Sequence, residues 1–153
     1  MKITDIDQVY KTGAGCLLLS RDTENFLLIQ RSEYVPAPNV WGLPGGKLDK
    51  NEEPEFAAKR ELYEETGINL LSRQFSLIYK NEVHAPRFTF YTYACIVENE
   101  MTPKLNWESS DFVWCNMSSL PTPLHWGVSQ LLHNNIAGNL LKRMLDQKAS
   151  VDN

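Results

Sequence analysis

The chain has 153 residues, 42% of them hydrophobic and 22% charged, with a formal net charge of −4. This length and composition suit one globular domain over residues 1–153 and exclude a disordered, collagen-like or coiled-coil chain. The negative charge argues against sequence-independent binding to a nucleic-acid backbone, so no stable nucleic-acid partner is expected.

The first half of the chain predicts two strands, a loop and a helix. The apolar stretch 13–20 indicates a strand, and a turn at 22–25 joins it to a second strand at 26–30 in a hairpin. A loop rich in Pro and Gly follows over 36–46, with a short strand near 40–43. A helix is expected from Pro54, which suits a first helical turn, to Thr66, with Gly67 as the left-handed residue that ends it.

The second half predicts further strands at 75–79, 88–97 and 111–116, followed by helix over 124–148 with a break near 134–135. Apolar residues in this last helical region repeat at a spacing that suits packing on the same domain or on a partner, so a monomer and a homodimer both stay open. Strands around one central helix, with helix at the end, indicate a mixed α/β or α+β fold.

The cysteines and the N-terminus indicate a compartment. Cys16, Cys95 and Cys115 are widely spaced in apolar runs, which indicates buried free thiols rather than a zinc site or a disulfide framework. The first residues lack the apolar core of a signal peptide, and no run approaches the roughly 20 apolar residues that span a bilayer. A cytoplasmic location without a membrane partner is therefore expected.

The segment 46–68 carries the candidate chemistry. Glu61, Glu64 and Glu65 fall on one face of the predicted helix, within an arc of about 100°. Like charges at this spacing destabilise a helix, so the cluster does not serve the helix itself. Clustered carboxylate oxygens are the ligands that a hard cation such as Mg²⁺ requires. Arg60 can hold such carboxylates in place through two parallel hydrogen bonds.

The spacing resembles the Nudix signature, which is Gly, five residues, Glu, seven residues and then Arg-Glu-aliphatic-x-Glu-Glu-x-Gly-aliphatic. The chain matches it at Gly46, Glu52, Arg60, Glu61, Leu62, Glu64, Glu65, Gly67 and Ile68. At a usage of roughly 7% per residue type, the strictly fixed positions would coincide by chance about once in 10⁸ starting points. The resemblance implies the Nudix fold, an α/β/α sandwich with a mixed central sheet.

The same resemblance implies a pyrophosphohydrolase that uses Mg²⁺ or Mn²⁺ to cleave the diphosphate linkage of a nucleoside diphosphate joined to another moiety. The implied metal set comprises the backbone carbonyl of Gly46 and the side chains of Glu52, Glu61, Glu64 and Glu65. Arg60 is expected to orient the glutamates. The general base is expected to be Glu64 or Glu65, with Glu108 as the candidate on a later loop.

The small nucleotide substrate stays open among three groups. These are a nucleoside triphosphate (including oxidised dGTP), ADP-ribose or a nucleotide sugar, and a dinucleoside polyphosphate or capped RNA. The alternative function is a catalytically inactive Nudix-fold module that binds a nucleotide, and the intact signature argues against it.

Candidate substrate residues follow from position. A nucleobase needs a stacking surface, for which Trp41, Phe88, Trp107 and Trp126 are candidates. Arg31, at the end of the second predicted strand, is placed to meet phosphate. The histidines, His84, His125 and His133, are assigned no role.

Overall fold

The computed structural model describes residues 11–84 and 87–147. The elements in chain order are β1 (Lys11–Ser20), β2 (Phe26–Arg31), β3 (Trp41–Gly42), β4 (Gly45–Lys47), α2 (Pro54–Thr66), the 3₁₀ turn η1 (Ser72–Gln74), β5 (Ser76–His84), β6 (Arg87–Val97), β7 (Ser109–Cys115), α3 (Trp126–Leu132) and α4 (Asn135–Asp146).

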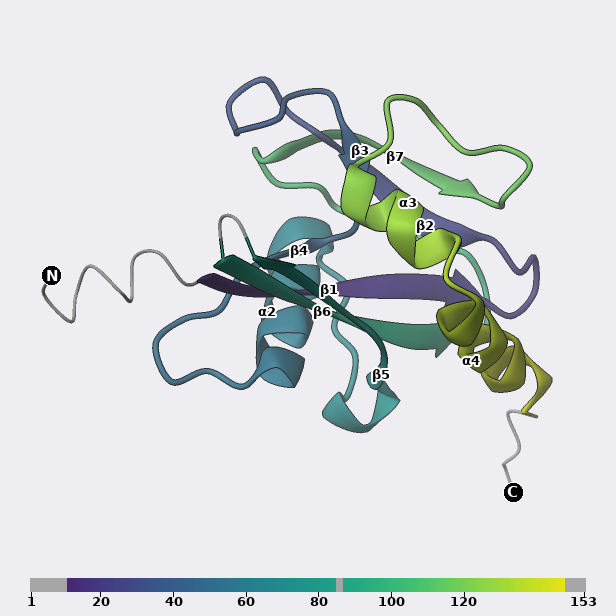
Figure 1. The fold of residues 1–153 in the computed structure, drawn as a ribbon. Helices are drawn as coiled ribbons and strands as arrows, with labels where there is room; N and C mark the ends of the chain where they lie inside the picture. The colour runs from purple at the N-terminus through teal and green to yellow at the C-terminus, as the bar shows by residue number, and fades with distance from the viewer. Residues whose placement is uncertain (1–10, 85–86, 148–153) are drawn as a thin grey trace, which may run out of the picture.

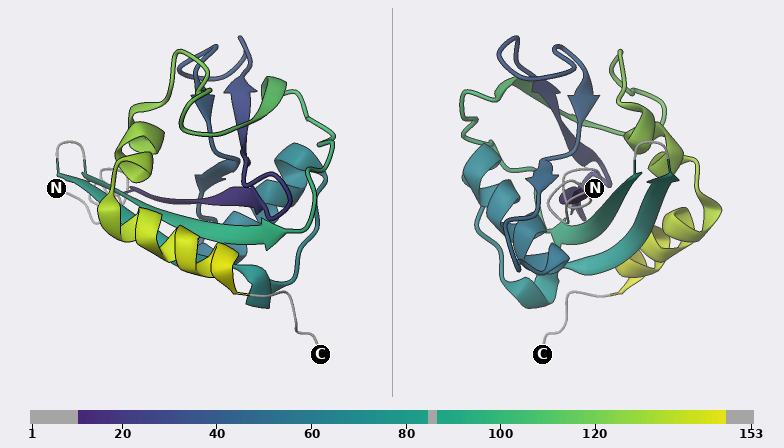
Figure 2. Two further views of the ribbon diagram at one scale, coloured as in Figure 1. Left: turned by 90° about the vertical axis from the view of Figure 1, so that its right-hand side faces the viewer. Right: turned by 60° about the vertical axis from the view of Figure 1, so that its left-hand side comes forward.

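A mixed sheet lies at the centre of the fold. Its strand order is β3-β2-β1-β6-β5, with β4 paired to β1 and β7 paired to β2. β1 and β6 run parallel, whereas the other pairs are antiparallel. Helix α2 covers one face of the sheet, and α3 and α4 cover the other (Figures 1 and 2). The predicted α/β/α sandwich is confirmed.

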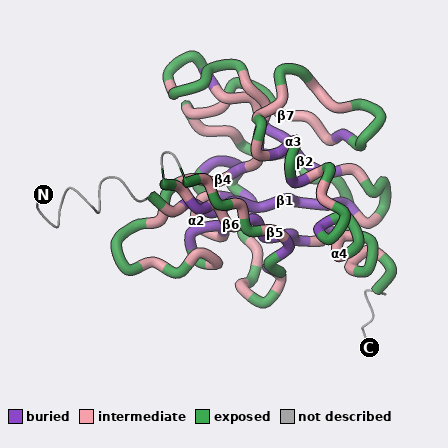
Figure 3. Tube along the Cα trace, viewed as in Figure 1, coloured by how far each residue is buried: buried purple, intermediate pink, exposed green. Residues whose placement is uncertain are grey.

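Strand β1 contributes to both hydrophobic cores. It is buried from its third residue to its end (Figure 3). Ala14, Cys16 and Leu18 belong to the core under α2, whereas Leu17 and Leu19 belong to the core under α3 and α4. Successive side chains of a strand point to opposite faces, so a strand covered on both faces reads as a continuous apolar run.

Helix α2 begins and ends where the sequence predicts. Pro54 occupies its first turn, and Gly67 follows it with φ 74° and donates its N–H to the Tyr63 carbonyl at 2.8 Å. A left-handed residue at this place closes the last turn, and glycine adopts it without steric cost. Ala57 and Ala58 are fully buried against the sheet, where their small side chains let the helix approach β1 closely.

The expected hairpin is present only in part. β1 and β2 are paired at Leu19 and Phe26, beside the turn. The two strands then diverge: β1 continues between β6 and β4, and β2 continues between β3 and β7. β4 begins within the segment 36–46 that was predicted as loop and ends one residue beyond it, and β5 extends beyond its predicted end to His84. The helical break near 134–135 is confirmed, since the Asn134 side chain caps α4 by accepting from Ala137 N–H at 3.0 Å.

Several smaller expectations can also be compared. The three cysteines are free and buried, as predicted. Helix α4 packs on the second core through Leu140, Leu141, Met144 and Leu145. Across 11–84 and 87–147, none of the helices has the length and apolar character needed to cross a bilayer. The expectations about a signal peptide and about helix reaching Lys148 concern residues outside the described part of the chain.

Candidate active site

The two glycines of strand β4 place main-chain atoms directly against glutamate side chains of α2. Gly45 N–H donates to Glu65 Oε2 at 3.0 Å. A Cβ on Gly46 would lie 2.7 Å from Glu61 Oε1, so a side chain at this position would collide with the carboxylate. A side chain at position 46 would therefore displace the Glu61 carboxylate from its present place.

Glu61 and Glu65 form a close acidic pair. Glu65 is 6% exposed. Burial, followed by the hydrogen bond and the negative charge of Glu61, raises the pKa of Glu65 to about 10, and the charge of Glu108 adds to the rise. Two carboxylates that lie within hydrogen-bonding contact in a buried place cannot both stay charged. One proton is therefore bound by the pair when no cation is present.

Arg60 organises the remaining acids. Its Nε and Nη2 donate to the two carboxylate oxygens of Glu52, each at 2.9 Å. Its Nη1 donates to Glu61 Oε1 at 3.0 Å and to Glu64 Oε1 at 3.2 Å. The hydrogen bond from Arg60 holds the pKa of Glu52 below its ordinary value, and the same bond is the largest cause of the raised pKa of Arg60. Arg60 thus occupies both oxygens of Glu52 and orients Glu61 and Glu64.

Glu108 joins this group through a loop contact. Asn106 Nδ2 donates to the Glu64 carbonyl at 3.0 Å and to Glu108 Oε1 at 3.3 Å. Asn106 Oδ1 accepts from Glu108 N–H at 3.0 Å. These bonds tie the loop before β7 to the last turn of α2. We call Glu52, Glu61, Glu64, Glu65 and Glu108 the carboxylate cluster.

The carboxylate cluster fits a divalent cation by its chemistry. The Glu61–Glu65 pair requires a positive partner, and a hard cation bound by oxygen ligands can take the place of the shared proton. Within the described ranges, no three acidic, histidine or cysteine side chains are already arranged around one point for a metal. The hydrogen bonds from Arg60 hold the carboxylates of Glu61 and Glu64 close to its guanidinium.

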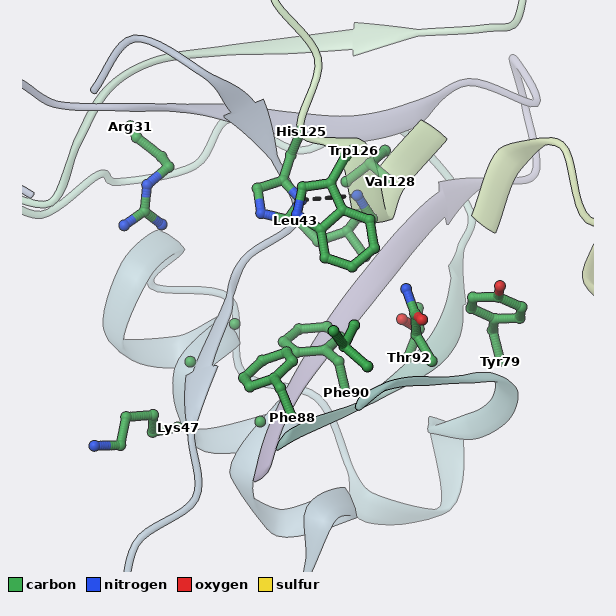
Figure 4. A pocket seen from close by; sticks show the side chains of 16 residues that line it. Arg31, Leu43, Lys47, Tyr79, Phe88, Phe90, Thr92, His125, Trp126 and Val128 are labelled. Carbon is green, nitrogen blue, oxygen red and sulfur yellow. Dashed lines mark hydrogen bonds between the residues drawn. The ribbon is translucent and has the colours of Figure 1, made fainter. Parts of the chain in front are cut away.

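A cavity of about 560 Å³ lies on the face of the sheet that carries α3 (Figure 4). Side chains of β5 and β6 form one wall, the start of α3 forms the opposite wall, and cationic side chains lie at one end. The lining residues are Gly13, Arg31, Leu43, Gly45, Gly46, Lys47, Tyr79, Asn81, Val83, Phe88, Phe90, Thr92, His125, Trp126, Gly127 and Val128. We call this space the aromatic cavity.

The two walls of the aromatic cavity carry stacked rings. Phe88 and Phe90 stack at 6.1 Å between centroids, and His125 and Trp126 stack at 5.8 Å. Gly13 leaves space for the Phe90 ring, since a Cβ at Gly13 would lie 2.9 Å from that ring. Trp126 faces Phe88 and Phe90 across the cavity (Figure 4). The space between these rings suits a flat aromatic group.

The structure separates the predicted substrate residues. Arg31 and Phe88 line the aromatic cavity, as does Trp126. A register shift in the β2–β7 pairing between Gln30 and Arg31 turns the Arg31 side chain, whose Nε donates to the Pro36 carbonyl at 2.6 Å. Trp41 packs against the second core instead and does not belong to the cavity lining.

Sequence reasoning missed Phe90, Lys47 and His125. Phe90 follows Phe88 at the strand period of two, so alternation places both rings on one face. Lys47 lies within the signature segment and carries a charge opposite to phosphate. His125 had no signal beyond its position at the start of the predicted helix, and its surroundings come from distant segments.

Comparisons with known proteins show the family of this chain. The family model for the NUDIX domain matches residues 9–134. The chain is 39% identical over 74 residues to an RNA pyrophosphohydrolase of Rhizobium meliloti, an alignment that covers 46% of this chain and 44% of the relative. It is 34% identical over 103 residues to the diphosphoinositol polyphosphate phosphohydrolase 3-alpha of Homo sapiens, covering 66% and 58%.

The chain thus spans about half the length of these curated relatives. Among solved structures, the MutT NUDIX hydrolase of Burkholderia pseudomallei superposes with a TM-score of 0.69 at 26% identity, over 82% of this chain and 97% of that one. Because the domain model covers most of the residues, including the whole glycine–glutamate segment, this protein belongs to the NUDIX family.

Proposed function

We propose that this protein is a metal-dependent hydrolase of the diphosphate linkage in a nucleoside diphosphate joined to another moiety, such as a nucleoside triphosphate (including oxidised dGTP), ADP-ribose or a nucleotide sugar. The observation that carries this proposal is that the aromatic cavity and the carboxylate cluster share one wall, formed by β4. Gly45 and Gly46 line the aromatic cavity and also contact Glu65 and Glu61. A nucleotide whose base lies in the cavity therefore brings its diphosphate to the carboxylates.

The chemistry of the cavity favours a nucleotide over an inositol pyrophosphate, the class named for the human relative. The walls carry aromatic rings, and the cationic residues among the lining are Arg31 and Lys47. A heavily phosphorylated inositol presents no flat apolar face and would need more cations to balance its charge. A nucleobase stacks on such rings, and two cations suit a diphosphate.

Glu61, Glu64, Glu65 and the Gly46 carbonyl would hold Mg²⁺ or Mn²⁺. Such an ion neutralises phosphate charge and lowers the pKa of bound water. Arg60 keeps Glu61 and Glu64 oriented for this task, and Glu52 holds Arg60 in place by accepting its hydrogen bonds. Glu52 thus acts in this proposal through Arg60.

Among the candidate bases, Glu108 is the best placed to accept a proton from the attacking water. Glu64 is held by Arg60, and Glu65 lies beside Glu61 as a proposed ligand of the cation. Glu108 is close enough to Glu65 to influence its ionisation, and its Oε1 accepts one hydrogen bond from Asn106. A carboxylate with a second oxygen available for water meets the geometric need of a general base.

Formation of nucleotide products from a nucleotide panel, separated by chromatography, tests the proposed function, because cleavage of a diphosphate linkage yields two phosphorylated products and no free phosphate. The panel contains dNTPs, 8-oxo-dGTP, ADP-ribose, nucleotide sugars and diadenosine polyphosphates, each with Mg²⁺, Mn²⁺ or a chelator. Wild type is compared with Glu64→Gln, Glu65→Gln and Glu108→Gln. We expect metal-dependent hydrolysis of one substrate group, with the greatest loss in Glu65→Gln. Absence of turnover throughout the panel would contradict the proposed function.

A further inference from the structure

Backbone hydrogen bonds hold His125 at the wall of the aromatic cavity. Its backbone N–H donates to the Trp41 carbonyl at 2.8 Å, and Trp41 N–H donates to the Pro123 carbonyl at 2.9 Å. These bonds attach the start of α3 to β3, which precedes Gly45 and Gly46 in the chain. The position of the histidine is therefore set relative to the shared wall.

The surroundings of the His125 ring select one tautomer. Gly127 N–H donates to His125 Nδ1 at 3.0 Å. A ring nitrogen that accepts a hydrogen bond carries no proton, so in the neutral ring the proton is on Nε2. A Cβ on Gly127 would lie 3.2 Å from Nδ1, which shows how closely the ring lies over this backbone. Trp126 stacks on the ring from another side.

The charges around His125 favour the neutral ring. Burial, followed by the positive charge of Arg31, lowers the pKa of His125. The titratable side chains that line the cavity with it are Arg31 from β2, Lys47 from β4 and Tyr79 from β5. Arg31 and Lys47 are cations and Tyr79 presents a hydroxyl group, so none of the three side chains stabilises an imidazolium.

The remaining ring nitrogen faces the cavity. In Figure 4, Nε2 points toward the side on which Arg31 lies, and the ring stands between Arg31 and Trp126. In the part of the chain that the structure describes, no protein group accepts a hydrogen bond from Nε2. A fixed donor without a protein acceptor is therefore directed at the space where a ligand would lie.

We propose that His125 is a substrate-binding residue whose Nε2–H, on an uncharged ring, donates to a non-bridging oxygen of the phosphate that bears the nucleoside. This inference rests on the proposed function. The base lies between Trp126 and the Phe88–Phe90 pair, and the diphosphate extends toward Arg31, Lys47 and Gly46. His125 stands where these two parts of the ligand meet, and a neutral donor fixes the direction of the phosphate without adding a third positive charge.

The tautomer is tested first, without any need for turnover. Long-range ¹H–¹⁵N NMR spectra of the wild-type imidazoles near neutral pH should show His125 as the Nε2–H tautomer, assigned by comparison with His125→Asn. Addition of ADP with Mg²⁺ should shift the Nε2 resonance of this ring more than those of His84 and His133. An Nδ1–H tautomer, an imidazolium, or a ring that does not respond to bound ADP would overturn the proposal.

Kinetics with the hydrolysed substrate provide the second test. His125→Ser keeps an acceptor for Gly127 N–H but removes the donor that reaches the cavity. We expect KM to rise about tenfold and kcat to change by less than about twofold, because the bond is made equally in the ground and transition states. His125→Asn, which retains a shorter neutral donor, should recover part of the affinity. A loss in kcat with unchanged KM would overturn the proposal.

The pH profile separates a neutral donor from a protonated one. The ratio of kcat/KM between wild type and His125→Ser should stay constant from about pH 6.5 to pH 8.5, since the ring is neutral throughout. A ratio that falls as the pH rises would show that the imidazolium is the active form and would overturn the proposal. If wild type hydrolyses nothing in the panel, the proposed function fails, while the NMR titration with ADP still decides the role of His125.

Discussion

The carboxylate cluster and the aromatic cavity meet at β4 but are built in different ways. Apart from Glu108, the cluster comes from the continuous segment 52–65, and hydrogen bonds from one residue, Arg60, orient Glu52, Glu61 and Glu64. The cavity is lined by residues as far apart as Gly13 and Val128. Under the proposed function, this difference means that the reaction chemistry is encoded locally, whereas substrate selection depends on how distant segments come together.

The largest expected effect comes from Glu65→Gln. Burial and the neighbouring Glu61 raise the pKa of Glu65 to about 10, so the neutral isostere should leave the metal-free fold and its unfolding midpoint nearly unchanged. Turnover should fall by a factor on the order of 10³, because the variant cannot supply the charge that a cation needs. Glu53→Gln, an exposed residue before α2 whose side chain caps nothing, is the matched control for kcat. Equal losses of kcat in both variants would show that turnover depends on the overall negative charge near α2 and not on Glu65 itself.

Arg60→Lys should have the next largest effect. Lysine retains the positive charge but not the two parallel hydrogen bonds to Glu52 or the reach to Glu61 and Glu64. We expect kcat to fall on the order of 10²-fold and stability to fall by about 1–2 kcal/mol, since the ion pairs are partly screened by solvent. Steady-state kinetics and thermal denaturation measure both. A variant with wild-type kcat would mean that Arg60 serves stability alone.

Trp126→Ala tests the cavity side of the comparison. Its side chain is half exposed, so the fold should tolerate the change. Loss of one stacking surface should raise KM roughly tenfold and leave kcat almost unchanged. Trp107→Ala is the control, because this more exposed tryptophan lies outside the cavity lining. An increase in KM for the control but not for Trp126→Ala would place the base elsewhere.

The smallest expected effect is a pH dependence of stability. The pKa of His125 is lowered in the folded protein, so below about pH 6.5 the unfolded chain takes up a proton that the folded chain excludes. Stability contributed by this residue is therefore present at neutral pH and is lost as the pH falls. The unfolding midpoint of wild type relative to His125→Asn should decrease between pH 7.5 and pH 5.5. A constant difference would show that His125 has an ordinary pKa.

Local patterns explain how much of the fold was predictable. The bounds of α2 follow from a proline and a glycine at its ends, and both cues act within the helix itself. β4 was missed because Gly45 and Gly46 have no side chains that indicate a strand. It pairs with β1 because glycine permits a very close approach, since a Cβ on Gly45 would lie 2.6 Å from the Ala14 carbonyl oxygen. Such pairing depends on a partner distant in the chain.

The candidate site divides in the same way. The glutamates of the signature were predicted from spacing, but their different surroundings were not, because the burial of Glu65 depends on packing against β4, whereas Glu64 is exposed. Trp41 was predicted to stack on a nucleobase because it is an aromatic residue shortly before Gly45 and Gly46. Packing places it against the second core instead. A lone histidine carries no pattern at all, and the tautomer of His125 becomes evident only from the Gly127 N–H beside it.

The backbone bonds between Trp41 and the 123–125 segment have an evolutionary consequence. They use main-chain atoms, so they do not depend on the identity of most side chains in that segment. Substitutions at the start of α3 can therefore change the shape and polarity of the cavity wall while its attachment to β3 persists. The proposed catalytic site can in this way acquire new ligand preferences through few mutations, and neither the glycines of β4 nor the glutamates of α2 need to change with them.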